Sequence, residues 1–519
     1  MKMLPIGIST LEKMIHDDCV YIDKTQFVAR LSKGSGYYFL SRPRRFGKSL
    51  LVDTLKQAFS GNKKLFKGLY LEENWDWSKS YPVIHFDFGV SSAYDSEETL
   101  LSIIWDVLNK TAKEYNITLD SQNYGLAFDE LIKKVAAKAN ATLVVLIDEY
   151  DKPILDVITD SSQALVMREM LKGLYSVIKV NDAHLRFVLL TGVTKFSKVG
   201  LFSGLNNLSD ITLHPDYADV CGYTQADLER EFKDYLMAGN IDKTQLKLWY
   251  NGYHFLGTQA QKVYNPFDIL LFFSNNFIYR NYWFETGSPS FLIKLVQKNK
   301  YYFPDMEDVV VTENLLASFD VDNISLLVVL LQAGYLTIKK MTTVGTNVAY
   351  ILNYPNLEVK KSLNNSLAGL ASTPEQKEAI LNKIDICLRE GNINGIGEVL
   401  KSHFASIPHD WYPFQNNMQY YEGFYASIIY SYFCALGYNT IAEDKTNVGR
   451  IDLTVELPDK FLIFEFKLRQ YGNAKSALKQ IKEKKYAEKY RSSGKPIYLL
   501  GMSFDVKTRN LHDFISEVY

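Results

Sequence analysis

A short polar loop near the N-terminus has the residue types that bind phosphate groups. Residues 42–49 read Arg-Pro-Arg-Arg-Phe-Gly-Lys-Ser and match the phosphate-loop pattern Gly-x-x-x-x-Gly-Lys-Ser/Thr except at the first position, where Arg42 stands. Gly47 lets the backbone approach a phosphate closely, and Lys48 can reach the terminal phosphate oxygens. Ser49 offers a hydroxyl to Mg²⁺. The loop therefore predicts a nucleotide-phosphate site.

Two acidic residues follow an apolar run further along the chain. Residues 142–147 read as a buried strand, and Asp148 and Glu149 come directly after it. In phosphate-loop enzymes a carboxylate at this position holds Mg²⁺, and a glutamate beside it can orient the attacking water. The alternative is that both acids only cap the strand, but the upstream loop favours the first interpretation. Thr191 ends another apolar run, where it would either sense the terminal phosphate or satisfy the strand end.

A second group of residues near the C-terminus has the spacing of a metal-dependent hydrolytic site. Twelve residues separate Asp452 from Glu465, which suits a β-hairpin that brings both carboxylates to neighbouring positions on adjacent strands. Strand periodicity puts Lys467 on the same face as Glu465, where its ammonium can orient or help to deprotonate a water. Oxygen ligands with open positions suit Mg²⁺ or Mn²⁺ and attack on a phosphodiester.

Two polar residues in flanking helical patterns fit the same site. Glu422 precedes the hairpin and would add a third carboxylate, and Gln480 lies in the helical pattern that follows it. The alternative is a charge arrangement on a solvated sheet face. Residues 461–466 are too apolar for a solvated face, however, and a buried carboxylate needs a partner or a metal ion.

Basic residues dominate the segment 467–495, where Glu483 and Glu488 are the only acids. The basic residues are Lys467, Arg469, Lys475, Lys479, Lys482, Lys484, Lys485, Lys489, Arg491 and Lys495. Such a patch can neutralise phosphates without reading sequence, although a solvated helix face is the alternative. The tyrosines of this segment either stack on bases or, as we favour, pack against the core.

Alternating strand and helix patterns must position the N-terminal residues. The strand-like runs are residues 37–41, 82–88, 142–147 and 186–191, and the helical patterns between them are residues 49–59 and 96–115. Continuous apolar strands alternating with helices are typical of an α/β domain with a parallel sheet. Nearer the C-terminus, a helical pattern at residues 420–436 precedes strand-like runs at 451–456, 461–467 and 497–500.

These patterns predict an α/β protein with four parts. The parts are a phosphate-loop NTPase domain at 1–223, a helical or winged-helix-like lid at 224–345, a helical connector at 346–407 and an α/β nuclease-like domain at 408–519.

The composition is that of a folded protein with several domains. The chain has 519 residues, 47% hydrophobic and 23% charged, which excludes extensive disorder and fibrous structure. A net charge of −1 means that any nucleic-acid surface is local. The four cysteines lie far apart, so neither a zinc ribbon nor a disulfide scaffold is expected. Without a signal-peptide core or an apolar stretch long enough for a bilayer, we expect a cytoplasmic protein without membrane contact.

Several N-terminal motifs resemble a known family. LPIGISTLEKM, VYIDKTQFV, FLSRPRRFGKSLL, LIDEYDKPI and LLTGVTKFSKVGLFSGLNNL together resemble the AAA-ATPase-like domain of bacterial proteins that pair it with a nuclease domain. The loop also resembles the GPRRxGKT form of archaeal-type and STAND-like ATPases. The resemblance covers roughly residues 4–220 and implies ATP binding through Lys48, Ser49 and Asp148. Arg42 departs from the common loop, which bears on ATP turnover more than on ATP binding.

The C-terminal constellation resembles the PD-(D/E)xK nuclease superfamily. Asp452 and the Glu465-Phe466-Lys467 tripeptide match its motif, and the flanking Glu422 and Gln480 agree with it. The match is close to the small nuclease domain found fused to the AAA-ATPase-like domain. It covers about residues 410–510 and implies a mixed central sheet flanked by helices, with metal-dependent DNA cleavage. Ile451 stands where the superfamily's name has proline.

Together these features predict an ATP-binding, AAA-like module that controls a Mg²⁺- or Mn²⁺-dependent nuclease, with DNA as the expected nucleic acid. The alternatives are a nucleotide-switched DNA-binding scaffold with an inactive nuclease fold, or a nuclease with a vestigial ATPase. AAA-like modules often need a neighbouring copy to supply an arginine finger, so a homo-oligomer is one expectation. The candidate fingers are Arg44, Arg45, Arg168 and Arg186, and the first two are also expected to contact the nucleotide.

Overall fold

The chain folds into two compact units. The structure is a computed structural model and describes residues 1–33, 36–91, 93–196, 201–202, 205, 207–256, 262–285, 303–316, 320–321, 324–369, 372–407 and 419–519. Unit 1 comprises Met1–Ser288 and Asp308–Asn356, and unit 2 comprises Pro289–Glu307 and Leu357–Tyr519. The chain therefore passes between the units three times. The four-part division expected from the sequence stays a prediction.

A five-stranded parallel sheet in the order β2-β3-β4-β1-β5 forms the centre of unit 1. Its strands are β1 (Tyr37–Ser41), β2 (Val83–Asp87), β3 (Leu143–Asp148), β4 (Leu185–Gly192) and β5 (Ser209–Asp210). The predicted α/β class and parallel sheet are confirmed. Because the strands are parallel, their carboxyl ends lie at one edge, and β4 separates the strand before the loop from the strand that ends in Asp148.

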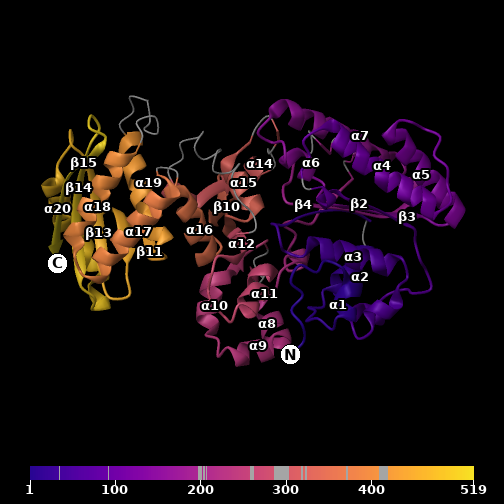
Figure 1. Cartoon of the computed structure of the whole chain (residues 1–519), viewed down its shortest axis with the longest axis horizontal. Coiled ribbons are helices and arrows are strands. Elements are labelled where there is room, and N and C mark those ends of the chain that lie inside the picture. Colours follow the sequence, from indigo (N-terminus) through magenta and orange to yellow (C-terminus); the bar gives the residue numbers. More distant parts are fainter. Residues whose placement is uncertain are drawn as a thin grey trace. The chain divides into compact units, whose positions relative to one another are not determined.

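Helices cover both faces of this sheet, which explains the continuous apolar strands (Figure 1). One face carries α1 (Leu11–His16), α2 (Thr25–Lys33) and α3 (Lys48–Phe59). The other carries α4 (Glu97–Glu114), α5 (Tyr124–Ala139) and α7 (Ser161–Val180), with the short α6 (Lys152–Leu155) before α7. Short 3₁₀ turns lie at Lys63–Phe66, Tyr70–Glu72, Phe88–Val90, Asp182–His184 and Pro215–Tyr217.

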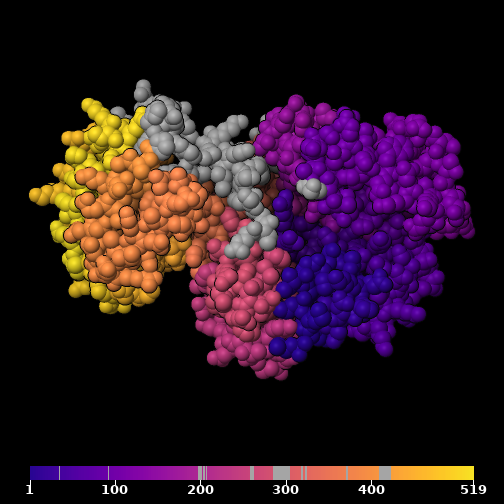
Figure 2. All heavy atoms as spheres, in the orientation of Figure 1, coloured from indigo at the N-terminus to yellow at the C-terminus, as the bar shows by residue number. Residues whose placement is uncertain are grey.

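The middle of the chain is mainly helical, as predicted. It contains α8 (Gln225–Glu231), α9 (Lys233–Ala238), α10 (Lys243–Tyr250), α11 (Pro266–Ser274) and α12 (Tyr282–Glu285), with a small hairpin of β6 (Asn251–Tyr253) and β7 (Val263–Tyr264). Val20 and Ile22 from the N-terminal segment join its core beside Phe232 and Phe272. The two segments also lie side by side on the surface (Figure 2).

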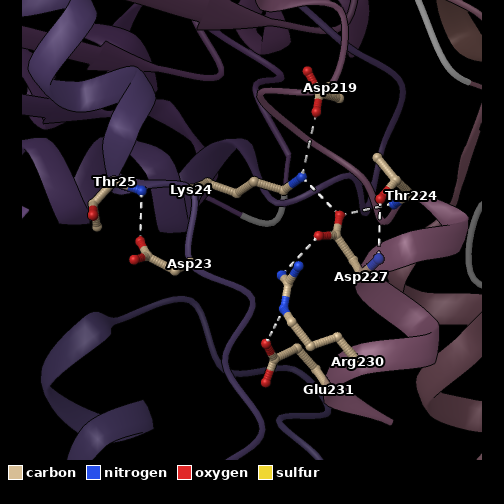
Figure 3. Close-up of polar contacts among 8 residues, drawn as sticks. All are labelled: Asp23, Lys24, Thr25, Asp219, Thr224, Asp227, Arg230 and Glu231. Carbon is tan, nitrogen blue, oxygen red and sulfur yellow. Dashed lines mark hydrogen bonds and ion pairs between the residues drawn. The ribbon is translucent and has the colours of Figure 1, made fainter. Parts of the chain in front are cut away.

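A polar network ties the N-terminal segment to the first helix of the middle region (Figure 3). The Lys24 ammonium donates to Asp227 Oδ2 at 2.9 Å and lies 3.9 Å from Asp219. Asp227 also accepts the backbone N–H of Thr224, while Thr224 Oγ1 accepts the N–H of Asp227, which forms a capping box at the start of α8. Arg230 donates to the other Asp227 oxygen at 3.1 Å. One carboxylate thus stabilises both a helix start and a tertiary contact.

The last part of unit 1 is a three-stranded antiparallel sheet with two short helices. In the order β8-β10-β9, its strands are β8 (Val309–Thr312), β10 (Asn347–Asn353) and β9 (Thr337–Val344). The helices are α14 (Glu313–Leu316) and α15 (Leu326–Ala333). Gly334 ends α15 with φ +92, and a Cβ there would lie 2.7 Å from Pro43 Cβ, so this helix end packs directly on the phosphate loop.

Unit 2 contains a mixed five-stranded sheet in the order β11-β12-β13-β14-β15. The strands are β11 (Asn439–Lys445), β12 (Arg450–Glu456), β13 (Phe461–Leu468), β14 (Ile497–Asp505) and β15 (Asn510–Val518). Only β13 and β14 run parallel. The expected hairpin is β12–β13, and the mixed sheet confirms the predicted fold class. The edge strands β11 and β15 were not predicted because half-exposed, polar strands lack the apolar run that marks β13.

Helices flank this sheet as well. The helices are α16 (Leu357–Ala368), α17 (Pro374–Arg389), α18 (Ile393–Ser406), α19 (Gln419–Ala435) and α20 (Ala474–Glu483), with 3₁₀ segments at Phe303–Met306 and Tyr486–Ser493. Leu478 and Ile481 of α20 pack on one face of the sheet, beside Ile463. Phe433 of α19 packs on Phe464, which points to the opposite face. The expected change of character at residue 408 lies outside the described residues.

The chain enters unit 1 for the second time between two anchored acidic residues. On the unit 2 side, Glu307 accepts hydrogen bonds from the Tyr430 hydroxyl and pairs with Lys360 at 2.7 Å. On the unit 1 side, Asp308 pairs with Lys339 at 2.7 Å and accepts from Asn353 Nδ2 at 2.8 Å. Among the described residues, no helix has both the length and the apolarity that a membrane span requires.

Candidate functional sites

The phosphate loop of unit 1 runs from the end of β1 to the start of α3. Gly47 has φ +93, a conformation that a residue with a side chain rarely adopts, and open space surrounds the position of its missing Cβ. α3 begins at Lys48, so the unpaired N–H groups of its first turn lie directly after this glycine. A loop of this shape leads an anion to the positive end of a 12-residue helix.

Lys48 is almost completely buried beneath its own loop. Its ammonium donates to the carbonyl oxygens of Arg42 at 3.0 Å and Pro43 at 3.1 Å. Burial lowers the pKa of Lys48, and the nearby Asp148 carboxylate opposes that shift. The Ser49 hydroxyl, half-buried in the first turn, makes no hydrogen bond within the part of the chain that the structure describes. Both side chains therefore sit where a bound nucleotide phosphate and its cation would need them.

Arg42, the residue that departs from the loop pattern, belongs to the core. Its guanidinium donates to three backbone carbonyls, those of Ser41 (2.9 Å), Thr212 (2.7 Å) and Tyr217 (2.9 Å). Its Cζ also lies 4.0 Å from the centre of the Phe255 ring. Burial lowers the pKa of Arg42 to about 10, which keeps it charged at neutral pH. The side chain is thus committed to joining the loop to the β5 and middle regions.

The middle region also holds the loop from outside. The carbonyl oxygen of Arg44 accepts from Asn265 Nδ2 at 3.3 Å and from Trp283 Nε1 at 3.2 Å. The Arg45 guanidinium, exposed on the loop, lies over the Phe267 ring at 4.8 Å. A movement of α11 or α12 therefore changes the backbone that surrounds the phosphate site.

Asp148 and Thr191 meet across the neighbouring strands β3 and β4. The Thr191 hydroxyl donates to Asp148 Oδ1 at 2.5 Å, and the same oxygen accepts the N–H of Glu149 at 3.0 Å. Asp148 is buried and faces the Lys48 side of the sheet edge. Thr191 thus orients this carboxylate through its hydroxyl, an arrangement that corresponds to the strand-end alternative considered from the sequence.

Glu149 lies beside the same edge in a left-handed conformation with φ +51. Burial raises its pKa, Lys48 opposes the shift, and Asp148 and Asp87 add to it. Asp87 ends β2 directly opposite Asp148 in the sheet register. A Cβ on Gly89 would lie 2.9 Å from Asp87 Oδ1 and 3.1 Å from Glu149 Oε2, so that glycine lets both carboxylates approach. Asp87 was missed from the sequence, although it closes the strand-like run at residues 82–88.

A second buried carboxylate braces this edge of the sheet. Asp151 Oδ2 accepts hydrogen bonds from the backbone N–H groups of Val193 (3.0 Å) and Thr194 (2.6 Å) and from the Thr194 hydroxyl (2.6 Å). A Cβ on Gly192 would lie 2.5 Å from Asp151 Oδ1 and 2.5 Å from the Tyr150 ring. The brace fixes the loop after β4 against the loop after β3, and it depends on a glycine at 192.

The four arginine-finger candidates differ in their surroundings. Arg168 pairs with Asp320 at 3.0 Å, and Arg186 lies at the start of β4 and donates to the Ser32 carbonyl at 2.7 Å. The start of β4 is the edge opposite the phosphate loop, since the strands are parallel. Arg44 and Arg45 are exposed beside the loop, where a nucleotide on the same or a neighbouring copy can be reached.

In unit 2, the hairpin β12–β13 brings Asp452 and Glu465 together. The ladder pairs Leu453 with Phe464, and Asp452 and Glu465 follow at the next position. There the Asp452 carboxylate replaces a backbone acceptor, because its Oδ2 accepts the N–H of Phe466 at 2.7 Å. This contact fixes Asp452 at the point where the strands separate.

Glu465 is the most deeply buried member of this group. With 1% of its surface exposed, its Oε1 accepts from Lys467 Nζ at 3.0 Å and from the amide of Gln480 on α20. Its Oε2 is buried without a hydrogen-bond partner among the described residues. Burial raises the pKa values of Glu465 and Asp452, each carboxylate raises that of the other, and Lys467 opposes both shifts. A buried carboxylate pair of this kind is stable at neutral pH when a cation neutralises it.

The residues present fit a hard divalent cation. The unpartnered Oε2 of Glu465 and the carboxylate of Asp452 supply oxygen ligands, and Mg²⁺ is commonly bound by only one or two carboxylates with waters completing its shell. Gln480 and Phe466 N–H hold the two carboxylates from behind, as outer partners of a metal site do. No group of three or more possible ligands forms among the described residues, so Glu422 is not brought into a common cluster with these two carboxylates.

Glu422 on α19 nevertheless belongs to the same electrostatic environment. Burial raises its pKa, Lys467 lowers it and Glu443 adds to the rise. Glu443 of β11 was missed from the sequence because β11 lacks an apolar pattern. It lies opposite Asp452 in the register, has φ +49 and pairs with Arg450 at 2.9 Å. The acids therefore surround one lysine, Lys467, from three elements.

Comparison with known proteins agrees with this arrangement. A family model described as "Predicted AAA-ATPase" matches residues 5–202, and one described as "PD-(D/E)XK nuclease superfamily" matches residues 420–514. A relative from Azotobacter chroococcum mcd 1, named "Uncharacterized protein in vnfD 5'region", is 44% identical over 519 residues, which cover 99% of each chain. The chain belongs to the AAA-ATPase-like family that carries a C-terminal PD-(D/E)xK nuclease domain.

The family assignment confirms the predicted pairing of the two domains. In this AAA-ATPase-like protein, the first match includes the phosphate loop, Asp148 and Thr191. The match to the PD-(D/E)xK superfamily includes Glu422, Asp452, Glu465, Lys467 and Gln480. The roles of these residues are taken up below as proposals.

Proposed function

We propose that the protein is a nucleic-acid nuclease, with DNA as the favoured substrate, whose cleavage by a divalent cation is controlled by ATP binding to the AAA-ATPase-like domain. The observation that carries the nuclease assignment is the buried Glu465, whose Oε2 has no hydrogen-bond partner among the described residues. This atom lies beside Asp452 and Lys467, and leaving a buried carboxylate oxygen unpaired is costly unless a cation completes it.

Each residue of the cleavage site has a separate role. Asp452 and Glu465 would hold Mg²⁺ or Mn²⁺, and when bound the cation polarises a phosphate oxygen and lowers the pKa of a water. Lys467 would orient the attacking water and neutralise charge at the phosphorus, because its ammonium is fixed by Glu465 at 3.0 Å. Gln480 would position Glu465, and Glu422 would act as an acid at the edge of the site.

The nucleotide site would work through its own set of residues. Lys48 would exchange its two loop carbonyls for phosphate oxygens, Ser49 and Asp148 would hold Mg²⁺, and Gly47 would admit the phosphate. Glu149 would orient water if ATP is hydrolysed. Thr191 would contribute by holding Asp148, and the exposed Arg44 and Arg45 would contact the nucleotide on the same copy or on a neighbour in a homo-oligomer.

Coupling between the sites is supported by two features of the chain. The carbonyl of Arg44 is bonded to Asn265 and Trp283, so the middle region responds to the phosphate loop. The chain then crosses between the units three times, so a rearrangement in unit 1 is delivered to unit 2 at several points. We further propose a cytoplasmic location, where the four unpaired cysteines stay reduced.

The test is cleavage of a labelled plasmid and a single-stranded oligonucleotide with Mg²⁺ or Mn²⁺, with and without ATP. Asp452→Asn and Lys467→Ala should abolish cleavage while leaving the unfolding temperature within a few degrees of wild type. Lys48→Ala should leave the catalytic residues intact and remove the response to ATP. Cleavage that persists in both Asp452→Asn and Lys467→Ala would reject the site.

A binding scaffold with an inactive nuclease fold predicts nucleic-acid binding without cutting in the same assay. A nuclease with a vestigial ATPase predicts cutting that ignores ATP. The only sequence feature in favour of the latter is Arg42, and its guanidinium is bound to the carbonyls of Ser41, Thr212 and Tyr217, which leaves the loop itself unobstructed.

A further inference from the structure

The basic residues that follow Lys467 fall into two groups. Six of them form ion pairs: Lys467 with Glu465, Arg469 with Asp505, Lys479 with Glu483, Lys482 with Glu517, Lys489 with Asp444 and Lys495 with Glu456. The remaining four, Lys475, Lys484, Lys485 and Arg491, are exposed and have no acidic partner within the described part of the chain. The unpaired charges therefore occupy a smaller surface than the sequence suggests.

Two of these unpaired residues are adjacent. Lys484 and Lys485 form the turn between α20 and the 3₁₀ segment Tyr486–Ser493, and Lys485 adopts φ +51. This left-handed residue ends the helix and turns the chain, so that both side chains stand on an exposed corner.

The same turn is joined to the cleavage site on both sides. Gln480, one helical turn before Lys484, donates to Glu465. Tyr486, directly after Lys485, is 3% exposed, and a Cβ on Gly449 would lie 2.9 Å from its hydroxyl oxygen. Gly449 precedes β12, the strand that carries Asp452, so Tyr486 reaches the start of the catalytic hairpin. The exposed turn is thus rigidly placed next to the two metal-binding carboxylates.

We infer that the Lys484–Lys485 turn is the surface that binds the phosphodiester backbone beside the bond to be cut. The inference rests on the proposed function only for its location next to a cleavage site, since phosphate binding itself needs no cutting. One residue spans ~3.5 Å, so the lysines reach phosphates a few nucleotides from the site, at ~3.4 Å of duplex axis per nucleotide. The contact is to the backbone, so it carries no base preference.

The experiment measures binding by fluorescence anisotropy of a labelled duplex, with the full chain in a buffer containing EDTA so that no cutting occurs. The variant is Lys484→Gln/Lys485→Gln. The matched control is Lys482→Gln/Lys495→Gln, which removes the same charge from the same segment but at ammoniums bound to Glu517 and Glu456. A rescue variant, Lys484→Arg/Lys485→Arg, keeps the charge, and the unfolding temperature of each variant checks the fold.

The expected result is a change in the salt dependence of binding. Loss of two phosphate contacts lowers the slope of log affinity against log salt by about 2. The affinity lost by the variant is then about tenfold larger at about 50 mM salt than at about 200 mM. The control should lose less than half of this slope, the rescue variant should match wild type, and DNA and RNA duplexes should respond alike.

An unchanged slope in Lys484→Gln/Lys485→Gln, or an equal loss in the control, would overturn the inference. So would a failure of the wild-type protein to bind either duplex. Binding with the expected slope, combined with no cleavage after Mg²⁺ is added, supports the phosphate surface and rejects the proposed nuclease, so the two failures are distinguishable.

Discussion

Replacing Arg42 with glycine makes the phosphate loop match its sequence pattern, yet we expect the change to damage the protein. A pattern-based argument predicts that Arg42→Gly improves nucleotide binding, because the first residue of the loop then has the usual type. The structure predicts the reverse, since the guanidinium supplies the donors for the carbonyls of Ser41, Thr212 and Tyr217. The variant leaves those acceptors without donors and opens space beside Phe255.

The size of the effect follows from these contacts. Each buried carbonyl that loses its donor costs about 1–3 kcal/mol, and removing one partner from a buried charged network costs about 3–5 kcal/mol in total. Relief of the desolvation cost of Arg42 is already included in the second figure. At about 2 °C per kcal/mol for a unit of this size, the unfolding temperature of unit 1 should fall by roughly 6–10 °C.

The assay is thermal unfolding with and without ATP, together with ATP binding by calorimetry. Arg45→Gly is the matched control, because it makes the same substitution in the same loop at an exposed position with φ +67, where glycine is unstrained. We expect the control to stay within about 2 °C of wild type. If Arg42→Gly unfolds at the wild-type temperature and binds ATP more tightly, the structural role assigned to Arg42 is wrong.

Three further predictions concern the other buried groups. Burial raises the pKa of Asp452 to about 7 and of Glu465 to about 8, so the stability that their protons give to the cation-free fold is present below their unfolded pKa values and lost as the pH rises through about 7–8. Added Mg²⁺ should therefore raise the unfolding temperature much more at about pH 8.5 than at about pH 6, and equal shifts would contradict this. Gly192→Ala forces a Cβ against a carboxylate and a ring at 2.5 Å, so it should cost about 1–3 kcal/mol in urea unfolding, and a wild-type midpoint would disprove the brace. Lys24→Met should cost about 1–3 kcal/mol because it leaves a buried carboxylate without its ammonium, whereas Lys110→Met, in an exposed i,i+4 pair, should cost under about 0.5 kcal/mol; similar losses would argue against the network.

Much of the fold could be predicted because its central elements carry strong local signals. The apolar strand at residues 143–148 and the amphipathic helix after Gly47 appear where their patterns indicate. Edge strands were harder, because β11 alternates weakly and exposes much of its surface. The small antiparallel sheet of unit 1 was missed for the same reason, since β9 is mostly exposed.

The sites were predictable where chemistry and spacing coincide. The thirteen-position step from Asp452 to Glu465 follows directly from hairpin register. The role of Arg42 could not be predicted, because its partners lie about 170 residues away in sequence. Asp87 and Glu443 were likewise invisible, since each becomes part of a site only through its neighbours in a sheet.

The threading of the chain through both units also constrains how the protein is made. Glu307 belongs to unit 2, where it meets Lys360 and the Tyr430 hydroxyl, yet the segment Asp308–Asn356 of unit 1 is synthesised in between. At ~5–20 residues per second, Tyr430 leaves the ribosome roughly 6–25 s after Glu307. During that interval unit 1 has all of its sequence, whereas unit 2 has only a fragment. The order of translation therefore completes the nucleotide-binding unit before the hairpin of Asp452 exists, and no newly made chain carries a cleavage site without its ATPase-like unit.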